Sequence, residues 1–285
     1  MTDGMPFERA AIIGLGLMGG SLARDLAARG VHVRAYDTDP ASIDAAMGAG
    51  VVQEAIDASF AGPALVDADL VVLAVPVDAA IRVLRRIAAN AHGARLVTDL
   101  GSTKRSIVAE ATALGLADRF VGSHPLCGDH RSGWASSRAC LFVDALVYMC
   151  PCETEGQVSD GLVHAVSELW QRVGARTTMV SADEHDRRLG WSSHLPHVVS
   201  TTLALALARA GVPRDQLGPG GRDVTRLAGS SPDLWTAIAC ENAQPLAEAL
   251  AAAEGEIASF KAFVLRGDAD AVHQRFATAR AWFDA

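Results

Sequence analysis

The stretch FVGSHPLCGDHRSGW, at residues 120–134, places a histidine where it could do chemistry. The β-prone pair Phe120 and Val121 runs into a Ser-His-Pro turn, so His124 is held at the end of a predicted strand. An imidazole with an unperturbed pKa near 6.5 can accept a proton at neutral pH. His124 is therefore a candidate general base. The alternative is a histidine that only hydrogen-bonds within a turn before proline.

A glycine-rich loop near the start of the chain is suited to hold a dinucleotide. An apolar strand precedes GLGLMG at residues 14–19, and an amphipathic helix follows it. In this motif the first glycine makes the tight turn, the second lets the backbone approach a pyrophosphate, and the third packs the helix on the strand. Asp37 ends the next strand, where a carboxylate accepts from ribose hydroxyls and repels a 2′-phosphate. The motif predicts NAD, in preference to NADP.

The elements that must position these residues alternate between strand and helix. Apolar strands are predicted at 68–76, 94–102 and 120–125, with helices between them, and two more strands flank a helix at 162–173. Such unbroken apolar strands are typical of a parallel sheet buried on both faces, whose ligands bind beyond the carboxyl ends of the strands. The predicted fold is α/β, with a Rossmann-type, mostly parallel sheet. The cofactor-binding residues predicted from the loop and the strand ends are Gly14, Gly16, Leu17, Met18, Gly19, Asp37, Val75 and Pro76.

From about Ser181 the pattern becomes purely helical. Ser181-x-x-Glu184 is a capping box, and the run at 182–211 is so apolar that we expect a buried helix, bent near Pro196. The predicted domains are a dinucleotide-binding domain at 1–182 and an all-α domain at 183–285. Large apolar helices in so small a domain predict a homodimer formed through it.

The composition narrows the class of protein. A net charge of -8 argues against general affinity for nucleic acid or anionic membranes. The five cysteines are odd in number and lack paired CxxC spacing, so we expect reduced thiols, with Cys150 and Cys152 in packing roles. No signal peptide and no membrane-spanning apolar run is evident. These features predict a soluble cytoplasmic protein.

Five motifs, in order along the chain, resemble the prephenate dehydrogenase family, which includes arogenate and cyclohexadienyl dehydrogenases. They are GLGLMGGS at the start, DLGSTK at 99–104, GSHPLCG at 122–128, EHDRRLGWSSHLPH at 184–197 and GGRDVTRLAGSSPDLWTAIACEN at 220–242. The resemblance implies NAD-dependent oxidation of a cyclohexadienol with loss of carbon dioxide, a step in tyrosine biosynthesis. It also implies a small-molecule substrate, prephenate or arogenate.

The resemblance also implies roles for individual residues. His124 is expected to take the proton of the ring C4 hydroxyl, and Ser102 to orient it and to contact the nicotinamide; a helix cap is the alternative for Ser102. Arg226 matches the family's substrate-binding arginine, whose guanidinium can hold a carboxylate by two parallel bonds. The other substrate-facing residues implied are His194, His197 and Trp235. No metal is expected, because HLPH lacks HxxxH spacing.

Several alternatives stay open. Asp129 could attract the amino group of arogenate or simply pair with Arg131, so prephenate, arogenate and an amino-substituted ring of specialised metabolism all remain. A β-hydroxyacid dehydrogenase would share the glycine-rich opening, but neither Lys104 nor Lys261 has the asparagine four residues later that its pattern requires. Lys104 is given no role and is read as a first-turn surface residue. The non-enzyme alternative is an NAD-binding sensor. A sensor would not require a base, so the presence of His124 together with Ser102, His197 and Arg226 argues against it.

Overall fold

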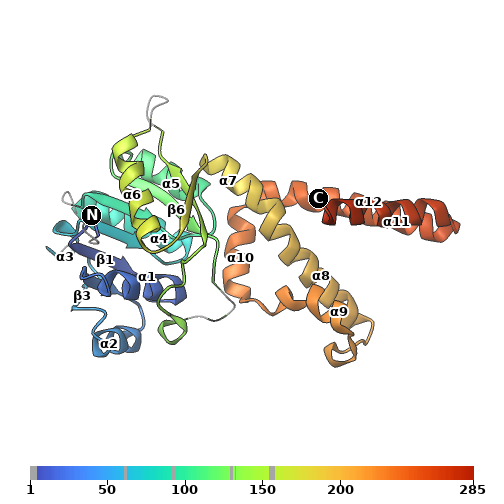
Figure 1. Cartoon of the computed structure of the whole chain (residues 1–285), viewed down its shortest axis with the longest axis horizontal. Coiled ribbons are helices and arrows are strands. Elements are labelled where there is room, and N and C mark those ends of the chain that lie inside the picture. Colours follow the sequence, from blue (N-terminus) through green and yellow to red (C-terminus); the bar gives the residue numbers. More distant parts are fainter. Residues whose placement is uncertain (1–4, 61–62, 91–93, 129–130, 132, 154–157) are drawn as a thin grey trace. The chain divides into compact units, whose positions relative to one another are not determined.

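The computed structural model describes residues 5–60, 63–90, 94–128, 131, 133–153 and 158–285. The chain divides into two compact units: Met1–Arg188 with Gly229–Glu241, and Leu189–Ala228 with Asn242–Ala285. The first unit is built on a sheet and the second is helical (Figure 1). This division differs from the expected boundary after residue 182, because most of α7 (Ala182–Leu189) and all of α10 (Pro232–Glu241) pack with the sheet.

The first unit contains an eight-stranded sheet in the order β3-β2-β1-β4-β5-β6-β7-β8. Strands β1 to β6 pair in parallel, β7 runs antiparallel to β6, and β8 runs parallel to β7. The predicted, mostly parallel sheet is therefore confirmed. Its strands are β1 Arg9–Ile13, β2 His32–Tyr36, β3 Glu54–Ala55, β4 Leu70–Leu73, β5 Leu96–Asp99, β6 Phe120–Pro125, β7 Leu146–Pro151 and β8 Arg176–Met179. The strand order reverses at β1, where doubly wound sheets bind their ligands.

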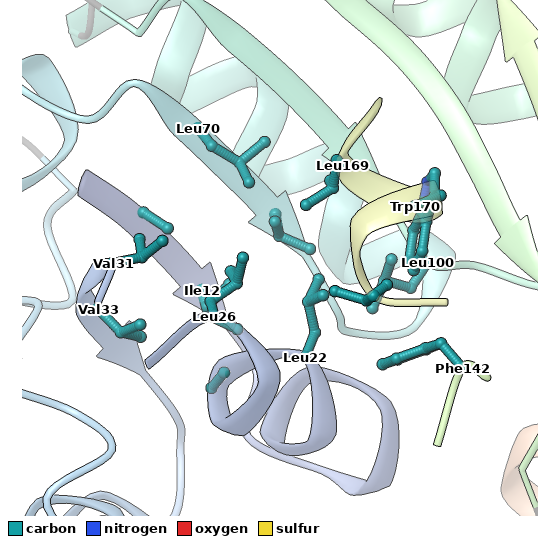
Figure 2. Close-up of a cluster of buried hydrophobic side chains, with 14 of the residues drawn as sticks. Ile12, Leu22, Leu26, Val31, Val33, Leu70, Leu100, Phe142, Leu169 and Trp170 are labelled. Atoms are coloured by element: carbon teal, nitrogen blue, oxygen red, sulfur yellow. The ribbon is translucent and has the colours of Figure 1, made fainter. Parts of the chain in front are cut away.

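Helices cover both faces of this sheet. Successive side chains of a strand point to opposite faces, so an unbroken apolar strand makes both faces apolar. Ile12 belongs to a core cluster with Leu22, Leu169 and Trp170, which Figure 2 shows between α1 and α6, whereas Ile13 belongs to the cluster on the other face. The remaining helices of this unit are α1 Leu17–Ala27, α2 Pro40–Gly48, α3 Pro63–Val66, α4 Val77–Asn90, α5 Arg105–Ala113 and α6 Asp160–Arg172, with a 3₁₀ turn at Trp134–Ser136.

The second unit begins where the expected bend occurs. Ser181 caps α7, its Oγ accepting from the Glu184 amide at 3.2 Å. A π-helical turn at Gly190–His194 then precedes α8 (Leu195–Arg209), because Pro196 cannot donate a backbone hydrogen bond. The rest of the unit comprises 3₁₀ turns at Arg214–Gln216 and Arg226–Gly229, α9 Pro219–Val224, α11 Ala243–Arg266 and α12 Ala269–Phe283.

The helical unit leaves apolar side chains in solvent. Leu203 and Leu205 of α8 are 36% and 53% exposed, which corrects the expectation that the chain itself buries this helix. Other exposed apolar residues lie on α11 and α12: Ile257, Val264, Leu265, Phe276, Trp282 and Phe283. Apolar faces of this kind are typical of surfaces that a partner covers. Within the described residues, no helix has the length and apolar character to cross a membrane.

Candidate functional site

A cavity of about 550 Å³ lies in the sheet unit, at the carboxyl ends of the strands that the sequence singled out. The glycine loop after β1, the ends of β4 and β5, and His124 near the end of β6 all line it. Helix α10 contributes Leu234, Ala237, Ile238, Cys240 and Glu241, and the segment after β6 adds Cys127, Gly128, Arg131 and Gly133. The cavity is also lined by five residues predicted to bind the cofactor, and that role remains a prediction: Leu17, Met18, Val75, Pro76 and Ser102.

The glycine loop has the shape that a dinucleotide pyrophosphate requires. A Cβ atom on Gly14 would lie 2.4 Å from the Ala74 carbonyl oxygen, and one on Gly19 would lie 2.0 Å from the Gly14 oxygen, so both positions exclude a side chain. A Cβ on Gly16 meets nothing within 4 Å, and Gly16 lines the cavity. The loop therefore leaves an open cradle at the N-terminus of α1, where helix amides favour negative charge.

Asp37, directly after β2, stabilises this loop by hydrogen bonds. Its Oδ2 accepts from the Leu15 amide at 2.7 Å, and its Oδ1 accepts from the Asp39 amide at 2.9 Å. The side chain is half-buried, and each carboxylate oxygen has a further acceptor position. Asp37 thus supports the loop, while its predicted contact with ribose hydroxyls stays a prediction.

His124 is the first member of a buried chain of hydrogen bonds. Its Nδ1 lies 2.9 Å from Nε2 of His185, whose Nδ1 lies 2.8 Å from Oδ1 of Asp186. His185 and Asp186 are both buried on α7. Burial lowers the pKa of His185. Burial alone would raise the pKa of Asp186, but hydrogen bonds from His185 and two backbone amides lower it. Sequence reasoning gave neither residue a role, although both stand in the EHDRRLG motif.

A buried ion pair lies beneath the same loops. Lys104 and Asp99 are fully buried and in direct contact, which corrects the reading of Lys104 as a surface residue. The Asp99 carboxylate also accepts from the amides of Gly101 at 2.8 Å and Ser123 at 3.2 Å. It therefore ties the end of β5 to the strand that carries His124, and a buried charge of this kind requires its partner.

The N-terminus of α5 is capped from a distant part of the chain. Asp186 accepts from the amides of Lys104 at 2.8 Å and Arg105 at 2.9 Å. Neither Ser102 nor Thr103 provides this cap. Ser102 lies on the cavity, half-buried, where its hydroxyl can serve a ligand instead.

The remaining predicted substrate residues are spread over both units. In the helical unit, His194 is buried, with its Nδ1 2.9 Å from the Asn242 amide nitrogen, and His197 directs its Nδ1 to the Ser193 carbonyl at 3.0 Å. Burial first, and then the positive charge of Arg226, lowers the pKa of His197, so these two side chains share one region. Arg226 is exposed.

Two further predicted residues have different outcomes. Trp235 is on α10 but is not among the residues that line the cavity, because the helix turns Leu234, Ala237 and Ile238 toward it. Asp129 lies outside the described residues.

Two of the cysteines have thiols that are poorly suited to ionise. Burial raises the pKa of Cys127 to about 11 and that of Cys150 to about 12, so both thiols stay protonated at neutral pH. Among the residues that the structure describes, no cluster of three or more His, Cys, Asp or Glu side chains is arranged to hold a metal ion.

A doubly wound sheet with a glycine cradle at its switch point, and a histidine at a nearby strand end, defines a nicotinamide-dinucleotide-dependent oxidoreductase. Residues 22–179 match the family described as "Prephenate dehydrogenase, nucleotide-binding domain", and residues 181–278 match "Prephenate dehydrogenase, dimerization domain". The chain therefore belongs to the prephenate dehydrogenase family, which confirms the resemblance seen in its motifs.

Similar proteins carry related names. The chain is 31% identical to the prephenate dehydrogenase of Bacillus subtilis over 96% of this chain and 74% of that protein. It is 32% identical to the cyclohexadienyl dehydrogenase of Zymomonas mobilis over 95% of this chain and 93% of that protein. Among solved structures, the prephenate dehydrogenase of A. aeolicus, in complex with hydroxyphenyl propionate and NAD+, superimposes with a TM-score of 0.85 at 28% identity and covers 96% of each chain.

Proposed function

We propose that this enzyme catalyses the oxidative decarboxylation of prephenate or arogenate with NAD, a step in tyrosine biosynthesis. The observation that carries the proposal is the position of His124, which lines the same cavity as the glycine cradle. A dinucleotide held by the loop of Gly14, Gly16 and Gly19 would supply the acceptor for the hydride of ring C4. The names of the relatives support the substrate class.

His124 is the proposed base. It accepts the proton of the C4 hydroxyl as the hydride leaves. The ring carboxylate then departs as carbon dioxide, its bonding electrons enter the ring, and a proton returns to the C4 oxygen to give a phenol. Aromatisation makes the sequence irreversible. Positioned acid–base groups typically contribute about 10²- to 10⁴-fold to a rate.

The substrate carboxylates need positive charge in a protein whose net charge is -8. Arg226 is the proposed anchor, because its exposed guanidinium can hold a carboxylate bidentately. His197 is proposed to contact the substrate in the same region as Arg226, with its Nδ1 donating to the Ser193 carbonyl. His194 and Trp235 are proposed to support this region, and Ser102 to orient His124 and the nicotinamide.

NAD is the proposed cofactor in preference to NADP. Asp37 directly follows β2, and a carboxylate at this position repels a 2′-phosphate. Asp37→Asn keeps an oxygen that can accept from Leu15 but loses the charge. We expect it to lower the ratio of kcat/KM for NAD to that for NADP by about 10-fold, or 1.4 kcal/mol. An unchanged ratio would remove Asp37 from cofactor selection.

A homodimer through the helical unit is also proposed. The exposed apolar side chains of α8, α11 and α12 support it, as does the match to the family's dimerization domain. Sedimentation equilibrium should give twice the chain mass of 29.8 kDa. The free cysteines suit a reducing, cytoplasmic setting.

The decisive variant for the base is His124→Gln. It should lower kcat by about 100-fold or more while NAD affinity stays within about twofold, since the cradle is untouched. His164→Gln, which alters an exposed histidine on α6, is the matched control and should retain full turnover. Near wild-type turnover of His124→Gln would remove His124 as the base.

A further inference from the structure

We propose that His185 and Asp186 are positioning residues, which hold His124 with its proton on Nδ1 so that Nε2 is presented to the substrate as the base. The inference deepens the proposed function and rests on His124 acting in that role. It is carried by the buried hydrogen-bond chain from α5 through α7 to β6.

The direction of each hydrogen bond follows from the Asp186 end. A carboxylate only accepts, and the amides of Lys104 and Arg105 both donate to it. The His185 Nδ1, 2.8 Å from Oδ1 of Asp186, must therefore carry a proton. His185 is fully buried, and burial lowers the pKa of its ring, which favours the neutral form, so its Nε2 carries none.

The same reasoning then gives the tautomer of His124. The His185 Nε2 can only accept, so the His124 Nδ1, 2.9 Å away, must donate. In neutral His124 the second nitrogen, Nε2, is then unprotonated, which is the state that a base requires. The opposite tautomer would place two unprotonated nitrogens in contact and would put the proton where the substrate hydroxyl must deliver its own.

The surroundings hold the relay in one geometry. Two amides at the N-terminus of α5 fix both carboxylate oxygens of Asp186. Tyr148, which is paired with His124 across β6 and β7, packs edge-on against His185 with ring centroids 5.6 Å apart. Neither imidazole can rotate freely in this arrangement, so the tautomer is set by fixed partners, as in other enzymes where a carboxylate orients a catalytic histidine.

Nitrogen-15 NMR of histidine-labelled protein tests the proposal without substrate. Above pH 8, wild-type His124, assigned by its absence in His124→Gln, should show the Nδ1–H tautomer. His185→Phe removes the acceptor and should shift His124 toward Nε2–H, whereas His185→Gln keeps a side-chain oxygen and should preserve Nδ1–H. An Nε2–H tautomer in wild-type protein overturns the proposal, and this spectrum decides even if His185→Phe fails to fold.

Kinetics supply the second test, and the pH profile separates positioning from stability. The titratable and charged groups around the relay include Asp186, Lys104, Asp99, Tyr148, Cys150 and Arg188, which is hydrogen-bonded to Tyr148, and all are retained in both variants. We expect His185→Phe to lower kcat by about 10²- to 10⁴-fold, with NAD affinity unchanged, and to move the acidic limb of the pH profile of kcat. The kcat of His185→Gln should be at least about tenfold higher than that of His185→Phe. Equal kcat and pH profiles for wild type and His185→Phe overturn the proposal.

The two proposals fail in different ways. If His124→Gln retains turnover, the base assignment is wrong whatever the tautomer. If His124→Gln is inactive but wild-type His124 carries its proton on Nε2, the base assignment stands and the positioning role of His185 and Asp186 is wrong.

Discussion

Two glycines in the cofactor loop provide a matched pair of perturbations. On Gly19 a methyl group would lie 2.0 Å from the Gly14 oxygen and 2.7 Å from the Ala74 Cβ. On Gly16, whose φ of -65° and ψ of -165° suit alanine, it would meet nothing within 4 Å and would stand in the cavity. The same substitution therefore tests packing at one position and ligand access at the other.

The expected magnitudes differ accordingly. Gly19→Ala forces α1 away from the sheet, and overpacking of this kind costs about 1–3 kcal/mol. For a chain of this size each kcal/mol lowers Tm by about 2–4 °C, so we expect a fall of about 2–12 °C. Gly16→Ala should change stability by less than about 0.5 kcal/mol. It displaces a charged pyrophosphate from amide donors worth about 1.5–3 kcal/mol, so NAD should bind about 10- to 100-fold more weakly.

Thermal denaturation and calorimetric titration with NAD measure the two effects. Gly48→Ala, at the end of α2, is the control, because nothing lies within 4 Å of its added methyl. NAD affinity equal to wild type in Gly16→Ala would refute the cradle assignment. A Gly19→Ala protein with wild-type Tm would refute the packing argument.

Three further predictions follow from the site. Lys104→Met leaves the buried Asp99 carboxylate without its partner charge and should lower the free energy of unfolding, measured in urea, by about 3–5 kcal/mol. The control Lys261→Met, at an exposed position, should change it very little, and a loss below about 1 kcal/mol in Lys104→Met would contradict the buried pair. Arg226→Ala should raise KM for the substrate about 10-fold or more through the loss of a charged hydrogen bond, while Arg222→Ala, which loses a bond to a backbone carbonyl, should not; equal KM values exclude Arg226 as the anchor. Burial lowers the pKa of His185 in the folded state, so the unfolded chain binds the extra proton at a higher pH, and the free energy of unfolding should fall as pH drops below about 6.5. In urea titrations at pH 7 and pH 5, His185→Gln should show a smaller fall than wild type. The same fall in both proteins would contradict this.

Local patterns made the dinucleotide unit predictable. The glycine spacing and the apolar strands each depend on a few consecutive residues, and the sheet follows from their alternation. The expected Ser-His-Pro turn was wrong, because β6 continues to Pro125 and His124 pairs with Tyr148 of β7. The return of α10 to that unit was not predictable, because residues 229–241 have the composition of any helix in the second half and their contacts are long-range.

Partners distant in sequence explain the other differences. A lysine in a first turn is ordinarily exposed, and only the fold shows that Lys104 reaches Asp99. The His-Asp pair of α7 meets His124 across 61 residues of sequence, which no spacing rule reveals. An apolar helix must be covered, but its pattern does not say whether the chain or a second copy covers it, and α8 leaves Leu205 exposed.

The most direct test of the proposed reaction is a two-by-two assay of the purified protein, with prephenate or arogenate as substrate and NAD or NADP as cofactor. Reduced cofactor and carbon dioxide should be measured together. We predict that NAD supports oxidation of at least one of the two acids, with one carbon dioxide released for each reduced cofactor, and that NADP supports far less. No reduction in any of the four combinations would contradict the proposed reaction.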